Sequence, residues 1–179
     1  ALGVKAVGVG ADAASTAGIG ALLDAAGSAF GPVDIYVANA GIIGAPDLGA
    51  EADWDRVLEV NLRGHIRAAD ALLPGWIERG TGHFVTVASA AGLLTQVGAA
   101  GYAVSKHAAV GFAEWLAITY GDNGIGVTCV CPMGVATPLL EAITGSADHT
   151  ARVAAASITT AGEVLSAEDV AAATDWGRK

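Results

Sequence analysis

Short apolar runs alternate with longer helical segments along this chain, and this order constrains the fold more than any other feature. Four runs have the composition of β-strands, at residues 4–9, 33–41, 83–89 and 125–131. Three longer segments have helical character, at residues 15–29, 51–79 and 99–121. The second of these contains Pro74, where we expect a kink. Such an alternation predicts parallel strands joined by crossover helices.

The strand-like runs are continuously apolar, as in a sheet that helices cover on both faces. We therefore expect one α/β domain over residues 1–179, built on a doubly wound, mostly parallel sheet. Ligands of such sheets bind beyond the carboxyl ends of the strands. These ends fall at residues 38–41, 88–92 and 132–137.

Charge and composition exclude several classes of function. The net charge of −9 argues against nucleic acid as a partner, and the chain has no polybasic run for an anionic membrane. No segment has the pattern of a membrane span or a signal peptide. Cys129 and Cys131, two apart in one strand, are expected to be reduced core residues of a cytoplasmic protein. No metal site is expected, because the scattered histidines lack ligand spacing and should lie at the surface or on helix flanks: His65, His83, His107 and His149.

Tyr102 and Lys106 stand four residues apart in the 99–121 segment, so they share one face of a helix. An ammonium group near a phenol lowers the phenol pKa from its reference of about 10. A tyrosine adjusted in this way can exchange a proton with an alcohol or carbonyl oxygen. Ser89, at the end of a strand, could orient the same oxygen. The Tyr-x-x-x-Lys pair alone is common on surface helices, so the prediction depends on its combination with other motifs.

The motifs VANAG, EVNLRG, the strand-end Ser89 and YAVSK occur in this order, and the chain thereby resembles the short-chain dehydrogenase/reductase family. The resemblance implies a Rossmann-like three-layer fold and the interconversion of alcohols and carbonyls with NAD or NADP. It makes Tyr102 the general acid/base and Lys106 the residue that binds the nicotinamide ribose and lowers the tyrosine pKa. Ser89 would hydrogen-bond the substrate oxygen, and Asn61 would hold a water in a proton relay.

The same resemblance implies a set of cofactor contacts in addition to Tyr102 and Lys106. The expected residues are Asp12 and Ala13 near the adenine ring, Asn39, Ala40 and Gly41 beside the sheet and the adenosine ribose, and Pro132, Val135 and Thr137 at the nicotinamide carboxamide. Met133 stands where the family usually has glycine, so it adds flexible apolar bulk beside the nicotinamide.

The stretch STAGIG, residues 15–20, looks like a phosphate-binding glycine turn but belongs to the helix between GAD and NAG. Measured against the family, the chain starts just before the third strand, without the first strands and their glycine turn. We then expect residues 33–41 to expose an apolar edge and residues 4–9 to lack a pairing partner. Two interpretations stay open: missing residues of a complete enzyme, which we prefer, or a non-catalytic fragment or scaffold that cannot hold the dinucleotide.

The expected substrate is a small apolar alcohol or ketone. Its pocket is predicted around Gly92, Leu93, Leu94, Val97, Met133 and Leu139. Residues 138–162 correspond to the family's substrate-covering region, with an ordinary surface loop as the alternative. The resemblance also implies a homodimer or homotetramer, assembled through the segments 51–79 and 99–121.

Overall fold

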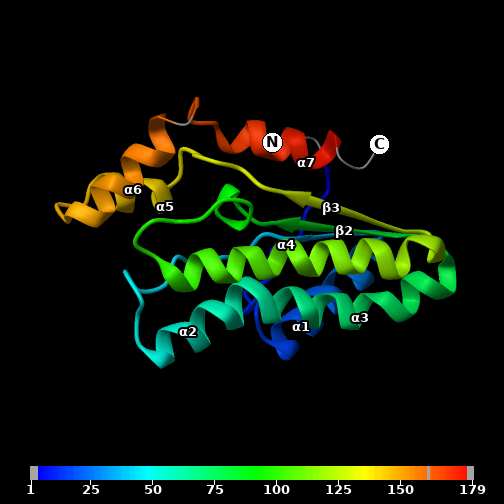
Figure 1. Cartoon of the computed structure of the whole chain (residues 1–179). Helices are drawn as coiled ribbons and strands as arrows, with labels where there is room; N and C mark the ends of the chain where they lie inside the picture. Colours follow the sequence, from blue (N-terminus) through cyan, green and yellow to red (C-terminus); the bar gives the residue numbers. More distant parts are fainter. Residues whose placement is uncertain (1–3, 161, 177–179) are drawn as a thin grey trace.

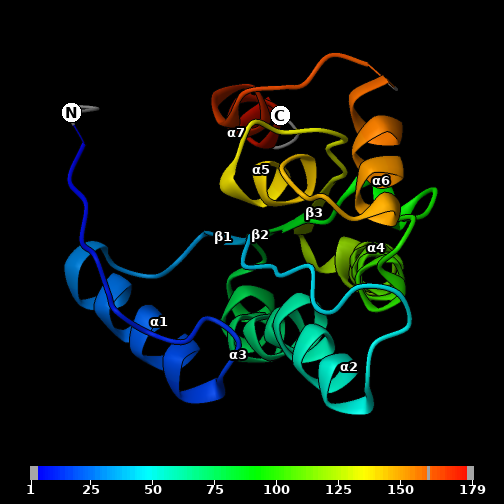
Figure 2. The ribbon, with the colours of Figure 1, turned by 90° about the vertical axis from the view of Figure 1, so that its left-hand side faces the viewer.

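The computed structural model of the chain describes residues 4–160 and 162–176, and it has three layers (Figure 1). The central layer is a parallel sheet in the order β1-β2-β3, formed by Ile35–Ala38, Gly82–Val87 and Ile125–Val130. Tyr36, Phe84 and Val127 stand side by side in its register. Helices α1, α3 and α4 form the layer on one face, and α7 lies against β3 on the other (Figure 2). The predicted parallel α/β sheet is confirmed.

Seven α-helices occur among the described residues: α1 Thr16–Phe30, α2 Glu51–Leu58, α3 Gly64–Arg79, α4 Ala100–Tyr120, α5 Pro138–Thr144, α6 His149–Thr160 and α7 Ala167–Trp176. Ser15 begins α1, because its side chain accepts a hydrogen bond from the Gly18 amide at 3.0 Å. Two short 3-10 turns, η2 at Ala90–Gly92 and η3 at Gly121–Asn123, flank α4. In the described part of the chain, none of these helices has both the length and the hydrophobicity needed to cross a membrane.

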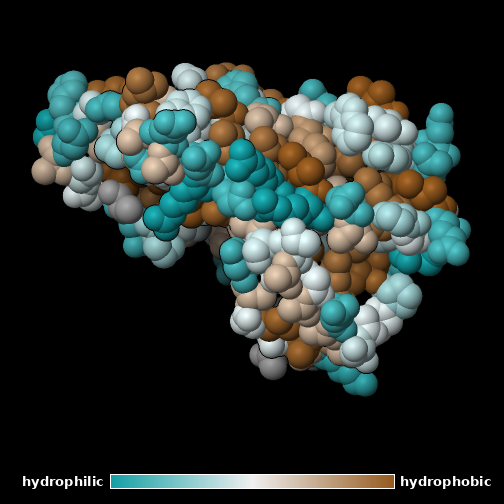
Figure 3. Space-filling model, turned by 90° about the horizontal axis from the view of Figure 1, so that it is seen from below, coloured by the Kyte–Doolittle hydropathy of each residue, from teal (hydrophilic) through white to brown (hydrophobic). Residues whose placement is uncertain are grey.

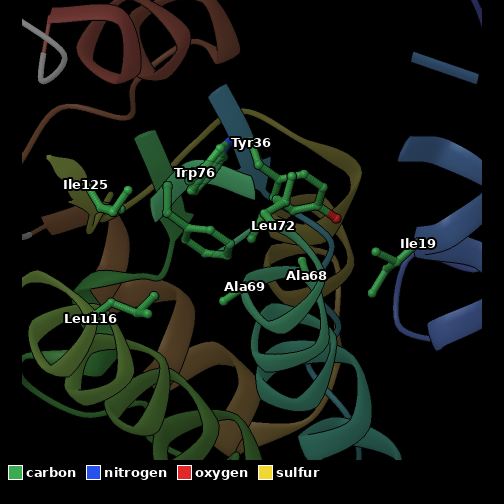
Figure 4. Packing of buried hydrophobic residues seen from close by; sticks show 10 residues of the cluster. Ile19, Tyr36, Ala68, Ala69, Leu72, Trp76, Leu116 and Ile125 are labelled. Carbon is green, nitrogen blue, oxygen red and sulfur yellow. The ribbon is translucent and has the colours of Figure 1, made fainter. Parts of the chain in front are cut away.

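The core lies between the sheet and the layer of α1, α3 and α4 (Figure 4). Tyr36 of β1 stacks on Phe84 of β2 with ring centroids 5.6 Å apart. Trp76 of α3 is 1% exposed, and its indole N–H donates to the Val33 carbonyl at 2.7 Å. Full burial of a large apolar side chain contributes about 2–3 kcal/mol. These aromatic residues therefore attach α3 firmly to the sheet and fix the position of the segment that precedes it.

Residues 4–9 do not form the predicted strand, whereas the expectation that they lack a pairing partner is confirmed. They run as an exposed extended segment away from the sheet (Figure 2), with Val4 73% exposed. A strand needs a hydrogen-bonded neighbour, and the sheet ends at β1. As expected, β1 is an apolar edge, with Ile35 40% and Val37 46% exposed.

The long helical segment at residues 51–79 is interrupted at a different place from the one predicted. Helix α3 continues through Pro74, whereas a π-helical turn, η1 at Glu59–Arg63, joins α2 to α3. A π turn takes about one residue more than an α turn, and such turns are frequent at functional sites. Asn61 lies at the centre of η1.

Candidate active site

A cleft of about 1120 Å³ opens at the carboxyl ends of the three strands. These ends of the strands face the viewer in Figure 2. Helices α5 and α6 form part of the wall of the cleft. Most of the residues predicted from the sequence line it: Asn39, Gly41, Ser89, Tyr102, Lys106, Pro132, Val135 and Thr137. Three loops and helix α4 thus bring together groups that are far apart in the chain.

Ser89 and Tyr102 both line this cleft, and the Ser89 hydroxyl is close enough to affect the pKa of the phenol. Ser89 lies beyond the end of β2 at Val87 and caps η2, where its hydroxyl accepts from the Ala91 amide at 3.2 Å. Burial raises the pKa of the Tyr102 phenol, and the Ser89 hydroxyl opposes that rise. The expectation of a lowered tyrosine pKa is therefore not met in this structure. The two hydroxyls can nevertheless face one oxygen atom of a bound molecule.

Lys106 lies one turn beyond Tyr102 and is 4% exposed. Its ammonium lies 5.7 Å from the centre of the Tyr102 ring and donates to the Val87 carbonyl at 3.0 Å. Burial lowers the pKa of Lys106 to about 8, and the thiols of Cys129 and Cys131 partly counteract that effect. The ammonium is thus held in place by the backbone of β2.

Asn61 is fully buried behind the cleft and connects two of its walls. Its Oδ1 accepts from the Ile42 amide at 2.8 Å, and its Nδ2 donates to the Ile42 carbonyl at 2.9 Å. The same Nδ2 donates to the Ser105 hydroxyl at 2.9 Å, which in turn donates to the Tyr102 carbonyl at 2.8 Å. Asn61 therefore positions the turn of α4 that carries the tyrosine.

Both hydrogens of the Asn61 amide are used in these bonds, so its side chain has no donor left. The side-chain N–H groups of Asn61 therefore cannot donate to the relay water that the sequence predicted. Ser105 was not predicted as a site residue, although it lies inside the YAVSK motif. Its burial and its two hydrogen bonds identify it as the link between Asn61 and Tyr102.

Three predicted cofactor residues, Asp12, Ala13 and Ala40, are not among those that line the cleft. Asp12 is exposed and accepts from the Ala14 amide at 2.9 Å. This turn is attached to α3, because Arg67 donates to the Ala14 carbonyl at 2.6 Å. The residues predicted near the adenine, Asp12 and Ala13, therefore do not share the cleft with those predicted near the nicotinamide.

The loop after β3 forms another wall. The Pro132 carbonyl accepts from the Ala90 amide at 2.8 Å. Thr137 precedes α5, and its hydroxyl donates to the Val135 carbonyl at 3.3 Å. Met133, at 37% exposure, lines the cleft together with Val97 and Leu139, as predicted. Leu93 and Leu94 are outside the cleft, 61% and 67% exposed, which corrects the predicted pocket. Gly92 is buried instead, where a Cβ would lie 2.6 Å from the Lys106 carbonyl oxygen.

Two further side-chain groups lie near Lys106. Cys129 and Cys131 are free, half-buried thiols with sulfurs 3.8 Å apart. Burial raises the pKa of Cys129 to about 12. His65 was expected at the surface or on a helix flank, but it is 3% exposed, and burial lowers its pKa to about 4. Its position one turn beyond Asn61 was the only signal for this placement in the sequence.

Comparison with known proteins gives consistent matches. The family model described as "short chain dehydrogenase" matches residues 1–148. A Streptomyces coelicolor protein named "Putative ketoacyl reductase" is 41% identical over 145 residues, which cover 79% of this chain and 56% of that protein. A Mycobacterium tuberculosis protein named as an uncharacterized NAD-dependent oxidoreductase is 44% identical over 115 residues, which cover 63% of this chain and 42% of that protein. The crystal structure of levodione reductase superimposes with a TM-score of 0.84 at 28% identity, covering 94% of this chain and 68% of that one.

Proposed function

Because the chain belongs to the short-chain dehydrogenase family, we propose that its protein is an NAD(P)-dependent oxidoreductase that interconverts an alcohol and a carbonyl by hydride transfer. The chain spans about half the length of the curated relatives it matches, so the activity is proposed for the protein as a whole. The observation that carries the proposal is the placement of Ser89, Tyr102 and Lys106 in one cleft, with the Lys106 ammonium 5.7 Å from the centre of the Tyr102 ring.

The cleft residues fit the nicotinamide half of the cofactor. Gly41 leaves space that a side chain would fill, since its Cβ would lie 3.3 Å from the Lys106 ammonium and 3.5 Å from Asn61 Oδ1. Asn39 lies beside it on the same wall, and Val135 and Thr137 stand on the loop after β3. Nicotinamide, when bound, supplies or takes the hydride. NAD and NADP are both kept as candidates.

The protein's own groups would manage the proton. In the direction of reduction, the Tyr102 phenol gives its proton to the carbonyl oxygen while the Ser89 hydroxyl donates a hydrogen bond to it. The phenolate that remains is stabilised by the Lys106 ammonium, which is mostly protonated at pH 7 because its pKa is about 8. In the direction of oxidation the same proton returns to the phenolate.

The shape and chemistry of the cleft support a small apolar alcohol or ketone as substrate. Apolar side chains dominate its outer wall: Val97, Met133, Leu139, Ile143, Ile158 and Val170. The described residues that line it include just two charged groups, Lys106 and Asp148. Helices α5 and α6, within residues 138–162, would cover the substrate.

Replacement of Tyr102 by Phe tests the mechanism, because it removes the exchangeable proton and little else. We expect turnover to fall by about 10²–10⁴-fold, followed by the absorbance of the reduced nicotinamide with a panel of alcohols and ketones and both nucleotides. Tyr120→Phe, on the same helix but outside the cleft, is the matched control. A Tyr102→Phe protein that keeps the parent rate would refute the assignment.

A non-catalytic binding or scaffold role is the second candidate, and the exposed edge of β1 favours it. Such a protein would not retain the dinucleotide. Titration with NADH and NADPH, followed by nucleotide fluorescence, separates the two functions. Binding of neither nucleotide would favour the scaffold.

Assembly as a homodimer or homotetramer through α3 and α4 is also proposed. Trp115 is 52% exposed and Ile118 85% exposed on α4, and Ile66 is 42% exposed on α3. Seen from the side of α2 and α3, hydrophobic patches lie between hydrophilic side chains (Figure 3). Sedimentation of the protein and of its Ile118→Glu variant tests the interface, since a charge there should favour the monomer.

A further inference from the structure

Helix α6 forms part of the wall of the cleft with one of its faces. The residues of α6 that line the cleft are Thr150, Ala151, Ala154 and Ile158, whose spacing places them on one side of the helix. Among the described elements, α6 packs mainly against α5, the short helix that precedes it. The position of α6 over the cleft therefore depends on contacts that it makes with the loops around the cleft.

The first turn of α6 comes very close to Gly98, which lines the cleft from the segment before α4. A Cβ at Gly98 would lie 2.4 Å from Thr150 Cγ2, much closer than two carbon atoms can pack. Gly98 also has a φ of +75°, in the left-handed region that favours glycine. The close approach of α6 is thus a second and separate reason for glycine at this position.

The backbone of Gly98 is firmly attached to the loop between β1 and α2. The Gly98 carbonyl accepts from the Asp47 amide at 2.7 Å, and the Asp47 carbonyl accepts from the Ala100 amide at 2.9 Å. The Thr150 side chain is branched at Cβ, so its rotation within a helix is restricted. A side chain at position 98 would therefore displace α6 rather than its own segment.

The other end of α6 is held by a contact with the loop after β3. A Cβ at Gly134 would lie 3.0 Å from Ile158 Cγ2, and the Gly134 carbonyl accepts from the Leu165 amide at 2.8 Å. A displacement at Thr150 would thus tilt α6 about this end. The tilt would open the cleft beside Gly98.

We propose that Gly98 determines substrate specificity, because the absence of a side chain there lets α6 close the cleft to a width that excludes bulkier substrates. Two carbon atoms pack at about 3.5–4.0 Å, so a Cβ at position 98 would move the first turn of α6 outward by about 1 Å or more. This inference deepens the proposed function and rests on it for the effect on catalysis. The position of α6 itself does not depend on the reaction.

The experiment compares Gly98→Ala with the double variant Gly98→Ala/Thr150→Ala, using two ketones that differ by one methylene group. We expect Gly98→Ala to shift the ratio of their kcat/KM values about tenfold toward the bulkier ketone. The double variant should return to the parent ratio, because the remaining Thr150 Cβ lies 3.5 Å from the added methyl group. Gly80→Ala is the matched control, since its φ of +67° imposes a similar backbone cost while its Cβ would meet open space. It should leave the ratio unchanged.

Hydrogen exchange of the α6 amides, measured by mass spectrometry, provides a readout that needs no activity. Gly98→Ala should accelerate exchange in His149–Thr160, because a displaced helix loses packing, and Gly80→Ala should not. An unchanged ratio or unchanged exchange in Gly98→Ala, or a double variant that stays shifted, would overturn the inference. A protein inactive with both nucleotides would refute the proposed function, and the exchange result alone would then decide this inference. If Gly98→Ala does not fold, Thr150→Leu, which adds bulk at the same contact, decides by the same measurements.

Discussion

The buried amide of Asn61 offers the most direct quantitative test of how the site is built. Asn61→Ala removes three hydrogen bonds, two to the Ile42 backbone and one to Ser105. Each such bond contributes about 1 kcal/mol net. Because Asn61 is 0% exposed, water cannot readily replace them. We expect the free energy of unfolding to fall by about 3 kcal/mol, a large part of the stability of a typical domain.

The measurement is equilibrium unfolding in urea, followed by circular dichroism. With a slope of about 2 kcal/mol per molar urea, the midpoint should move by about 1.5 M. Asn123→Ala is the matched control, since Asn123 is exposed in η3 and should change the midpoint little. Asn61→Asp should also destabilise at pH 7, because a carboxylate lacks both donors and carries a buried charge. A loss below 1 kcal/mol for Asn61→Ala would refute the view that this amide holds the two walls together.

Three other outcomes are expected. The folded pKa of His65, about 4, lies below its reference value of 6.5, so the unfolded chain takes up the proton first. Stability should fall by about 3 kcal/mol as the pH drops from 6.5 to 4, and urea midpoints of His65→Gln should show a smaller fall. Gly92→Ala should lower the free energy of unfolding by about 1–3 kcal/mol, because its Cβ would meet the Lys106 carbonyl. Gly111→Ala in α4, where a Cβ meets open space, is the control and should not lower it. Thermal unfolding measures both variants. Met133→Gly should raise kcat/KM for bulkier ketones, because Met133 lines the cleft. An unchanged kcat/KM would show that this side chain does not limit the substrate.

The sequence predicts the parts of this structure that depend on local pattern. The period of residues 99–121 places Tyr102 and Lys106 on one face of α4, and Ser89 reaches the same cleft because parallel strands end at a common edge. The strand at residues 4–9 fails because pairing requires a neighbour that composition cannot supply. The hydropathy of a segment indicates whether it can form a strand, whereas strand pairing depends on residues elsewhere in the chain.

The pKa shifts of the site residues could not be predicted from the sequence either. The four-residue spacing correctly brings Lys106 near Tyr102, but the ammonium donates to the Val87 carbonyl, and burial raises the tyrosine pKa. His65 is likewise buried in α3, and this burial lowers its pKa. Spacing fixes which side chains are neighbours, whereas the direction of a pKa shift depends on distances and solvent access.

The π turn at Glu59–Arg63 means that the helix from Glu51 to Arg79 contains one residue more than a uniform α-helix over the same path would need. Deletion of Leu62 would let this stretch wind regularly, with a complete set of α-helical hydrogen bonds. It would also take Asn61 out of the wide turn, so its amide would no longer be held at the same point against Ser105. A regular α-helix at this place would thus position Tyr102 less well than the interrupted one.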